Sequence, residues 1–183
     1  ARVVLVGGDG VSYGAAPPST KAVDGKASAP RSWRQIFQDE VRDQISAQDW
    51  SRVHFVGNLP YPEFISLLQI SSVHVYLTYP FVLSWSLMEA MSLGCAIVAS
   101  NTPPVREMLS HQETGLLVDF FDHAALVEQV CTLLDNPTLR QRLGQAARAH
   151  VVAHHDLRSQ CLPRQLAWVE SLPDLPALPS VVV

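Results

Sequence analysis

The residues from Ser84 to Glu89 have the types and spacing that could hold a nucleotide. Ser84-Trp85-Ser86 follows an apolar, strand-like run and opens a helical segment that Gly94 closes. Free backbone N–H groups at a helix start, together with the positive end of the helix dipole, attract phosphate. Because this helix follows a strand, we expect its start to lie at the carboxyl edge of a sheet, where a diphosphate would bind.

Glu89, one turn inside this helix, has two interpretations. Its carboxylate only accepts hydrogen bonds, which suits the two neighbouring hydroxyls of a ribose. Alternatively, Ser86-Leu87-Met88-Glu89 fits the pattern of a capping box, in which the glutamate binds the backbone N–H of the cap residue. The residue types alone leave both interpretations open.

The other candidate groups are better explained without catalysis. Three histidines have a helical spacing at which they could ligate a metal (His150, His154 and His155). Only the neighbouring Asp156 could complete the set of ligands, so we interpret the histidines as a solvated helix end. Asp119 and Asp122 are interpreted as a turn and a helix cap rather than paired catalytic carboxylates. Arg106-Glu107 is predicted to begin a short helix at the cleft, with a ligand contact there as the less favoured alternative.

Five short apolar runs are predicted to be the strands that position these groups. Because the runs are continuous rather than alternating, we expect strands buried on both faces, as in a parallel sheet (Arg2–Val6, Val53–Val56, Val73–Thr78, Ala96–Ala99 and Leu116–Val118). Helical patterns separate them, and the chain beyond Asp122 is helical. The fold class is therefore α/β, a Rossmann-like open parallel sheet with helices on both faces and a helical C-terminal tail.

Length and composition narrow the possibilities further. The 183 residues suffice for one domain, which we place at residues 1–172, with residues 173–183 as a loose tail. The net charge of −4 argues against a nucleic-acid protein. Three widely spaced cysteines fit reduced thiols in a cytoplasmic protein. Residues 14–30, rich in Gly, Pro, Ala and Ser, are predicted to form a long loop at the carboxyl edge of the sheet.

The run SWSLMEAMSLGCAIVA (residues 84–99) resembles the signature of a known enzyme family. These are the retaining GT-B glycosyltransferases of the sucrose-synthase-like, or glycosyl transferases group 1, family. Their signature reads Glu-Gly-Phe-Gly-Leu, three residues, then Glu-Ala-Met-Ala-x-Gly-x-Pro-Val-Val-Ala-Ser. The similarity extends to VLVGGDG, VHFVG, NTPPVRE and ETGLLVD, and covers about residues 2–135 of the chain.

The resemblance implies roles for residues of the C-terminal, donor-binding domain of a GT-B fold. Glu89 matches the glutamate that binds the ribose hydroxyls. The turn that cradles the diphosphate and sugar matches Val82, Leu83, Ser84 and Trp85. The loop that receives the base matches Gly57, Asn58 and Leu59, and Gly7 and Gly8 match the glycines that border the cleft.

The sequence departs from the family pattern at two positions of the sugar-binding turn. Phe81 stands eight residues before Glu89, where the family has its first glutamate, and phenylalanine cannot accept a hydrogen bond from a sugar hydroxyl. Ser84 replaces a glycine and leaves less room for close approach of the ligand. These changes affect the expected sugar contacts more than the nucleotide contacts.

The implied activity is transfer of a sugar from a nucleoside diphosphate sugar to a glycan or lipid-linked acceptor. The resemblance implies that no metal or other cofactor is needed, and that the enzyme works in the cytoplasm, near the inner membrane. Two alternatives stay open: a nucleotide- or partner-binding module without transfer activity, and a GT-B sugar-nucleotide epimerase.

The family also has elements that do not precede Ala1 here. They are a first strand-helix unit, which carries an arginine and a lysine for the diphosphate, and an N-terminal acceptor domain. We therefore expect this stretch of chain to be inactive alone, and either less stable than the whole or prone to self-association.

Overall fold

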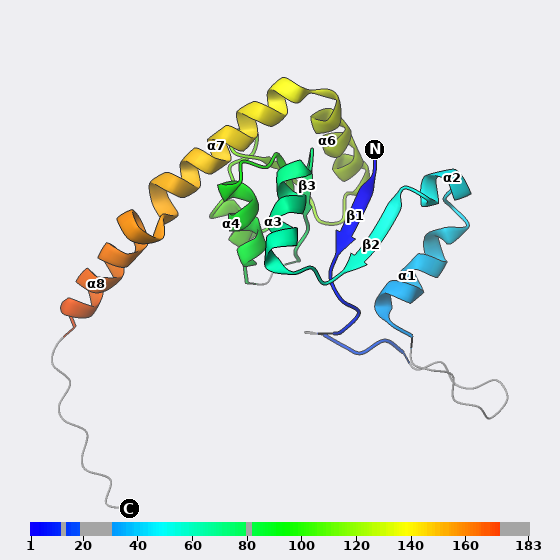
Figure 1. Cartoon of the computed structure of the whole chain (residues 1–183), viewed down its shortest axis with the longest axis horizontal. Helices are drawn as coiled ribbons and strands as arrows, with labels where there is room; N and C mark the ends of the chain where they lie inside the picture. Colours follow the sequence, from blue (N-terminus) through cyan, green and yellow to red (C-terminus); the bar gives the residue numbers. More distant parts are fainter. Residues whose placement is uncertain (12–13, 19–30, 80–81, 173–183) are drawn as a thin grey trace, which may run out of the picture. The chain divides into compact units, whose positions relative to one another are not determined.

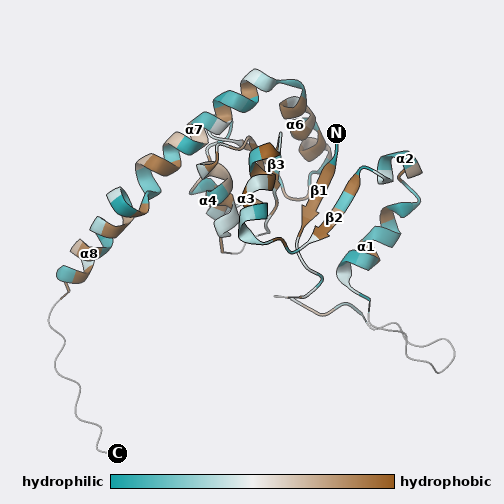
Figure 2. Ribbon diagram, in the orientation of Figure 1, coloured by the Kyte–Doolittle hydropathy of each residue, from teal (hydrophilic) through white to brown (hydrophobic). Residues whose placement is uncertain are grey.

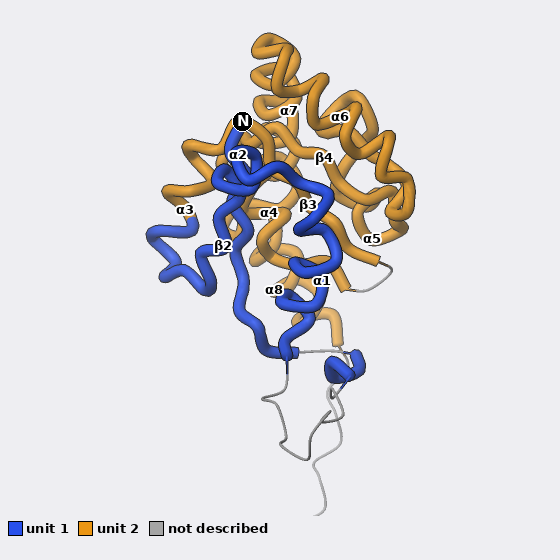
Figure 3. Tube along the Cα trace, turned by 90° about the vertical axis from the view of Figure 1, so that its right-hand side faces the viewer, with its two compact units in different colours: residues 1–64 blue, residues 65–183 orange. Residues whose placement is uncertain are grey.

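The structure is a computed structural model that describes residues 1–11, 14–18, 31–79 and 82–172 (Figure 1). Phe81, most of the predicted loop at residues 14–30 and the predicted tail at residues 173–183 lie outside the described residues. The chain forms two compact units, residues 1–64 and residues 65–183 (Figure 3). Helix α3 (Tyr61–Ile70) contains the boundary between them.

The first unit is a parallel pair of strands connected through two helices. Its elements are β1 (Val3–Val6), α1 (Trp33–Arg42), α2 (Ala47–Trp50) and β2 (Val53–Gly57). β1 pairs in parallel with β2, with Val3 opposite Val53. Both strands are rich in hydrophobic residues (Figure 2). A capping box starts α1, because Ser32 accepts the N–H of Gln35 and the Gln35 side chain accepts the N–H of Ser32.

The second unit contains a three-stranded parallel sheet in the order β3-β4-β5. The strands are β3 (His74–Tyr76), β4 (Ile97–Ser100) and β5 (Leu116–Val118), and short helices α4 (Trp85–Ser92) and α5 (Pro103–Arg106) connect them. The chain then continues as α6 (His123–Asp135), α7 (Pro137–His155), a π-helical turn (Leu157–Cys161) and α8 (Leu162–Glu170).

The core of the second unit forms around β4. All four residues of this central strand are buried, and because successive side chains point to opposite faces, both faces of the strand are covered. One cluster joins β4 and β5 to the helical tail, through Val98, Leu116, Leu133 of α6 and Leu143 of α7. The helical tail therefore completes the core.

Helices α4 and α7 approach each other through two glycines. Gly94 follows α4 with a φ of +74°, and its N–H donates to the carbonyl of Met91, which ends the helix. A Cβ atom on Gly144 of α7 would lie 2.1 Å from the carbonyl oxygen of Gly94. The absence of a side chain at Gly144 thus permits this contact between backbones.

The mixed α/β fold with parallel strands and a helical C-terminal region is as predicted from the sequence. Each of the five predicted strands is present, but the prediction that all are buried on both faces is wrong for β1, whose four residues are exposed. Asn136-Pro137 separates α6 from α7, with the Asn136 side chain accepting the N–H of Leu139. Within the described residues, no helix combines the length and apolar character that crossing a membrane requires.

Candidate functional site

The start of α4 is fixed to the end of β3. Ser84 is the N-cap of the helix, and its hydroxyl accepts the N–H of Ser86. The N–H of Ser84 donates to the hydroxyl of Tyr76, at 2.9 Å, which ties the turn to the strand. Trp85, the first helical residue, has 82 % of its surface exposed, and its N–H has no partner among the described residues. The helix therefore presents a free donor at its positive end.

The capping-box interpretation of Glu89 is wrong. The helix begins at Trp85 with Ser84 as its cap, so Ser86 lies inside the first turn and its backbone N–H is bound by Ser84. Glu89 is half-buried, and within the described residues its carboxylate has no hydrogen bond or ion pair. A carboxylate without a structural partner one turn behind a free helix start is available for a ligand that donates hydrogen bonds.

In the first unit, the predicted base-loop and cleft residues lie together at the carboxyl ends of β1 and β2. The N–H of Gly7 donates to the carbonyl of Gly57 at 2.9 Å. Gly7 and Gly57 have φ values of +141° and +70°, which glycine adopts without strain. A Cβ atom on Gly8 would lie 3.1 Å from the side chain of Asn58. The two turns thus pack at the carboxyl edge of this strand pair, and Leu59 follows them.

At the carboxyl edge of the second sheet, Ser100 continues the hydrogen bonding between β4 and the chain past the end of β3. This buried serine ends β4, and its hydroxyl donates to the carbonyl of Thr78 at 2.7 Å and accepts the N–H of Thr78 at 3.0 Å. On the other side, the N–H of Asn101 donates to the carbonyl of Val118. Sequence reasoning missed Ser100; a lone hydroxyl at the end of an apolar strand was the available signal.

Three aromatic rings meet above this extended edge. Tyr79 follows β3, while Phe120 and Phe121 follow β5, and their ring centroids lie 5.0–5.5 Å apart with edge-to-face geometry. Asp119 accepts the N–H of Phe121, and Asp122 caps α6 by accepting the N–H of Ala125. The interpretation of the two aspartates as a turn and a helix cap is confirmed, whereas the aromatic cluster was not predicted.

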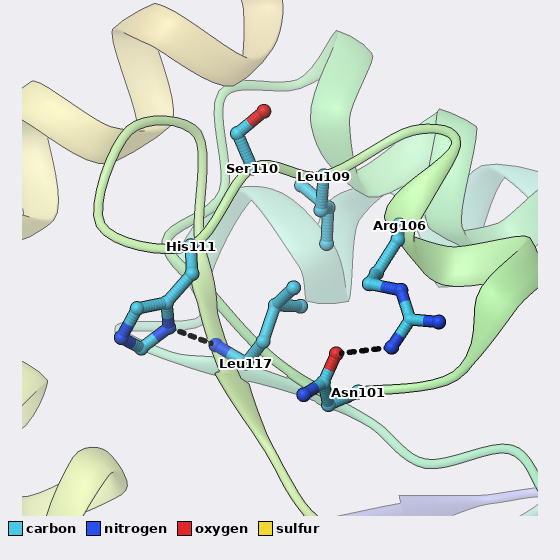
Figure 4. Close-up of a pocket in the computed structure, with 6 residues that line it drawn as sticks. All are labelled: Asn101, Arg106, Leu109, Ser110, His111 and Leu117. Carbon is cyan, nitrogen blue, oxygen red and sulfur yellow. Dashed lines mark hydrogen bonds between the residues drawn. The ribbon is translucent and has the colours of Figure 1, made fainter.

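A cavity of about 490 Å³ lies between α5 and β5 (Figure 4). Arg106 donates to the side chain of Asn101 at one end, and at the other end Nδ1 of His111 accepts the N–H of Leu117. Arg106 ends α5 rather than beginning a helix, because Thr102 and Pro103 start it. His111 binds an outward N–H of the outer strand β5, so its contact has a structural role.

The remaining titratable groups of the second unit do not form a reaction centre. Burial lowers the pKa of His74 and raises the pKa of the Cys95 thiol, so both stay neutral at neutral pH. Burial, then the neighbouring His154 and His155, lowers the pKa of His150. No group of three or more His, Cys, Asp or Glu side chains in the described part of the chain is arranged to hold a metal ion.

Comparison with known proteins identifies the relatives of this chain. A family model described as "Glycosyl transferases group 1" matches residues 37–150. The D-inositol 3-phosphate glycosyltransferase of Corynebacterium efficiens is 27 % identical over 126 residues, which are 69 % of this chain and 28 % of that protein. The chain thus spans less than a third of the length of this relative.

Solved structures share the fold. Sucrose-phosphate synthase from Thermosynechococcus elongatus superposes with a TM-score of 0.68 and 23 % identity, over 92 % of this chain and 38 % of that one. Anabaena HepE in complex with UDP and glucose superposes with a TM-score of 0.65 and 19 % identity, over 93 % of this chain and 40 % of that one. These likenesses extend beyond the residues that the family model matches.

Proposed function

The chain belongs to the glycosyl transferases group 1 family, and we propose that it is the nucleotide-sugar-binding domain of a retaining glycosyltransferase. The whole enzyme transfers a sugar from a nucleoside diphosphate sugar to a glycan or lipid-linked acceptor. The observation that carries the proposal is the Glu89 carboxylate, which has no partner among the described residues and lies one turn behind the N-terminus of α4. We place the enzyme in the cytoplasm, near the inner membrane where lipid-linked acceptors are found.

The start of α4 has the chemistry that a departing diphosphate requires. The free N–H of Trp85 and the helix dipole stabilise negative charge as the bond between sugar and phosphate breaks. The Glu89 carboxylate accepts hydrogen bonds from the ribose hydroxyls and thereby fixes the nucleotide relative to the helix. In this proposal the helix start supplies the charge stabilisation that a divalent cation supplies elsewhere, so chelation of metal with EDTA leaves nucleotide binding unchanged.

The named ligands and substrates of the relatives support this assignment. HepE of Anabaena was solved with UDP, with UDP-glucose, and with UDP and glucose. Relatives by sequence include a phosphatidyl-myo-inositol mannosyltransferase of Mycobacterium leprae, 41 % identical over 70 residues. UDP is therefore the first nucleotide to test, and GDP serves as a second nucleoside diphosphate with a different base.

Glu89→Gln tests the proposed site directly. The amide keeps the size of the side chain but loses the charge, so we expect UDP affinity to fall by about 1–3 kcal/mol, as for a hydrogen bond to a charged group. Isothermal titration calorimetry measures the change. The control is Glu128→Gln, an exposed glutamate on α6, which should bind UDP like the wild type. Equal affinities for both variants and the wild type would refute the assignment of Glu89.

Phe81 favours a second candidate, a nucleotide-binding module without transfer activity, because it removes a sugar contact of the family. The full-length protein, incubated with a panel of nucleotide sugars with and without acceptor extract, distinguishes the alternatives. Release of nucleoside diphosphate only with acceptor indicates transfer. Interconversion of the sugar indicates epimerisation, and binding without either reaction indicates the module.

A further inference from the structure

The aromatic cluster of Tyr79, Phe120 and Phe121 exposes more ring surface than a packing cluster needs. Tyr79 and Phe121 are 58 % and 68 % exposed, although each makes an edge-to-face contact with the other and with Phe120. Each edge-to-face contact covers one face of one ring, and the exposure of Tyr79 and Phe121 shows that other ring surface stays open to a flat or ring-shaped group. Large aromatic side chains that stay exposed together commonly mark a ligand or partner site.

Hydrogen bonds between side chains and the backbone, rather than burial of the rings, hold the cluster in place. Ser100 fixes Thr78 from both sides and so sets the position of Tyr79. The Asp119 side chain accepts the N–H of Phe121 at 2.8 Å and fixes the turn that carries the two phenylalanines. The rings are therefore arranged before any ligand arrives, which lowers the entropy cost of binding.

The chemistry of the cluster suits a pyranose ring. One face of a pyranose carries C–H groups that pack on aromatic faces, while its hydroxyls need hydrogen-bond acceptors at the rim. Asp119 is exposed beside the cluster, and a carboxylate has acceptor capacity beyond the one bond to Phe121. The hydroxyl of Tyr79 adds a donor and acceptor.

The position of the cluster favours the sugar of the donor as its occupant. Tyr79 follows the same strand, β3, that anchors the start of α4 through the bond between Tyr76 and Ser84. In a nucleotide sugar the pyranose is bonded directly to the diphosphate that we assign to that helix start. Phe81, two residues after Tyr79, removes a carboxylate acceptor from this segment.

We propose that Tyr79, Phe120 and Phe121 form an aromatic platform on which the pyranose ring of the donor sugar stacks. The inference rests on the proposed function, since it extends the diphosphate site at α4 to the sugar. The platform selects for the apolar face of the sugar, and Asp119 selects for a hydroxyl at its rim.

The test compares each nucleotide sugar with its own nucleotide. Calorimetry on the 183-residue chain measures UDP against UDP-glucose and GDP against GDP-mannose, for the wild type, Tyr79→Ala and Phe121→Ala. We expect each alanine variant to lower the affinity for the nucleotide sugar by about threefold to tenfold, and to leave the affinity for the nucleotide unchanged. Phe121→Trp, which keeps an aromatic face, should retain most of the affinity. Phe37→Ala is the control, because Phe37 is 55 % exposed and stacks on Trp33 of the same helix.

The outcomes separate this inference from the proposed function. If a variant lowers the affinity for the nucleotide and for the nucleotide sugar equally, or lowers neither, the platform is overturned while the nucleotide site stands. If the wild type binds neither UDP nor GDP, the proposed function fails, and saturation-transfer NMR with methyl α-D-glucopyranoside decides the platform. Saturation transfer to the glucoside that Phe121→Ala abolishes supports a pyranose site. Absence of saturation transfer in the wild type overturns it. Both truncated rings are more than half exposed, so unchanged melting temperatures will confirm that the variants fold.

Discussion

At the scale of single residues, Ser100 joins the end of β4 to the segment that follows β3. Its one hydroxyl serves both backbone groups of Thr78 and is fully buried. Ser100→Ala leaves that N–H and carbonyl without their partner, so we expect the chain to lose about 1–3 kcal/mol of stability. Chemical denaturation measures the loss. Ser71→Ala, which removes a hydroxyl bonded to the Leu67 carbonyl at the end of α3, serves as the control and should cost less. A loss no larger than the control's would contradict the role given to Ser100.

At the scale of secondary-structure elements, the contact between α4 and α7 depends on Gly144. In an exposed helix, replacing glycine by alanine gains about 1 kcal/mol. Here the new Cβ would lie 2.1 Å from the Gly94 carbonyl oxygen, so the two helices must separate. We expect Gly144→Ala to destabilise the chain by about 1–3 kcal/mol, which reverses the sign that propensity alone predicts. Thermal unfolding measures this, and Gln145→Ala, at the exposed neighbouring position, should be close to neutral. A more stable Gly144→Ala variant would show that the helices can adjust.

The same elements show what the sequence can and cannot predict. Strands and helices were predictable because apolar runs and helical spacing are local patterns, as in β4 and α6. The sequence placed the start of α4 within Ser84-Trp85-Ser86 but did not decide between the two serines as the cap, because both fit; the structure assigns the cap to Ser84. The bonds from Ser100 to Thr78 and the meeting of Tyr79 with Phe120 join residues more than 20 positions apart. Such contacts depend on strand order, which no local pattern encodes.

At the scale of the whole molecule, burial is unequal between the two units. Among the described residues, every buried hydrophobic side chain lies between Leu68 and Val151, in the second unit. In the first unit, all four residues of β1 are exposed despite their apolar side chains, and neither α1 nor α2 has a buried residue. Because buried apolar surface is the main source of stability, the first unit is the weaker one.

Amide hydrogen exchange should therefore separate the units. We expect amides of β1, α1 and β2 to exchange through local opening, at least tenfold faster than those of β4, α4 and α7, since a difference of about 1.4 kcal/mol in opening free energy gives that factor. The exchange is measured by mass spectrometry under native conditions. UDP provides the internal comparison: because Glu89 and the start of α4 lie in the second unit, added UDP should slow exchange at α4. Uniform protection across both units would mean that the first unit gains stability from contacts beyond its own sparse core. Light scattering would then test whether those contacts come from self-association of the chain.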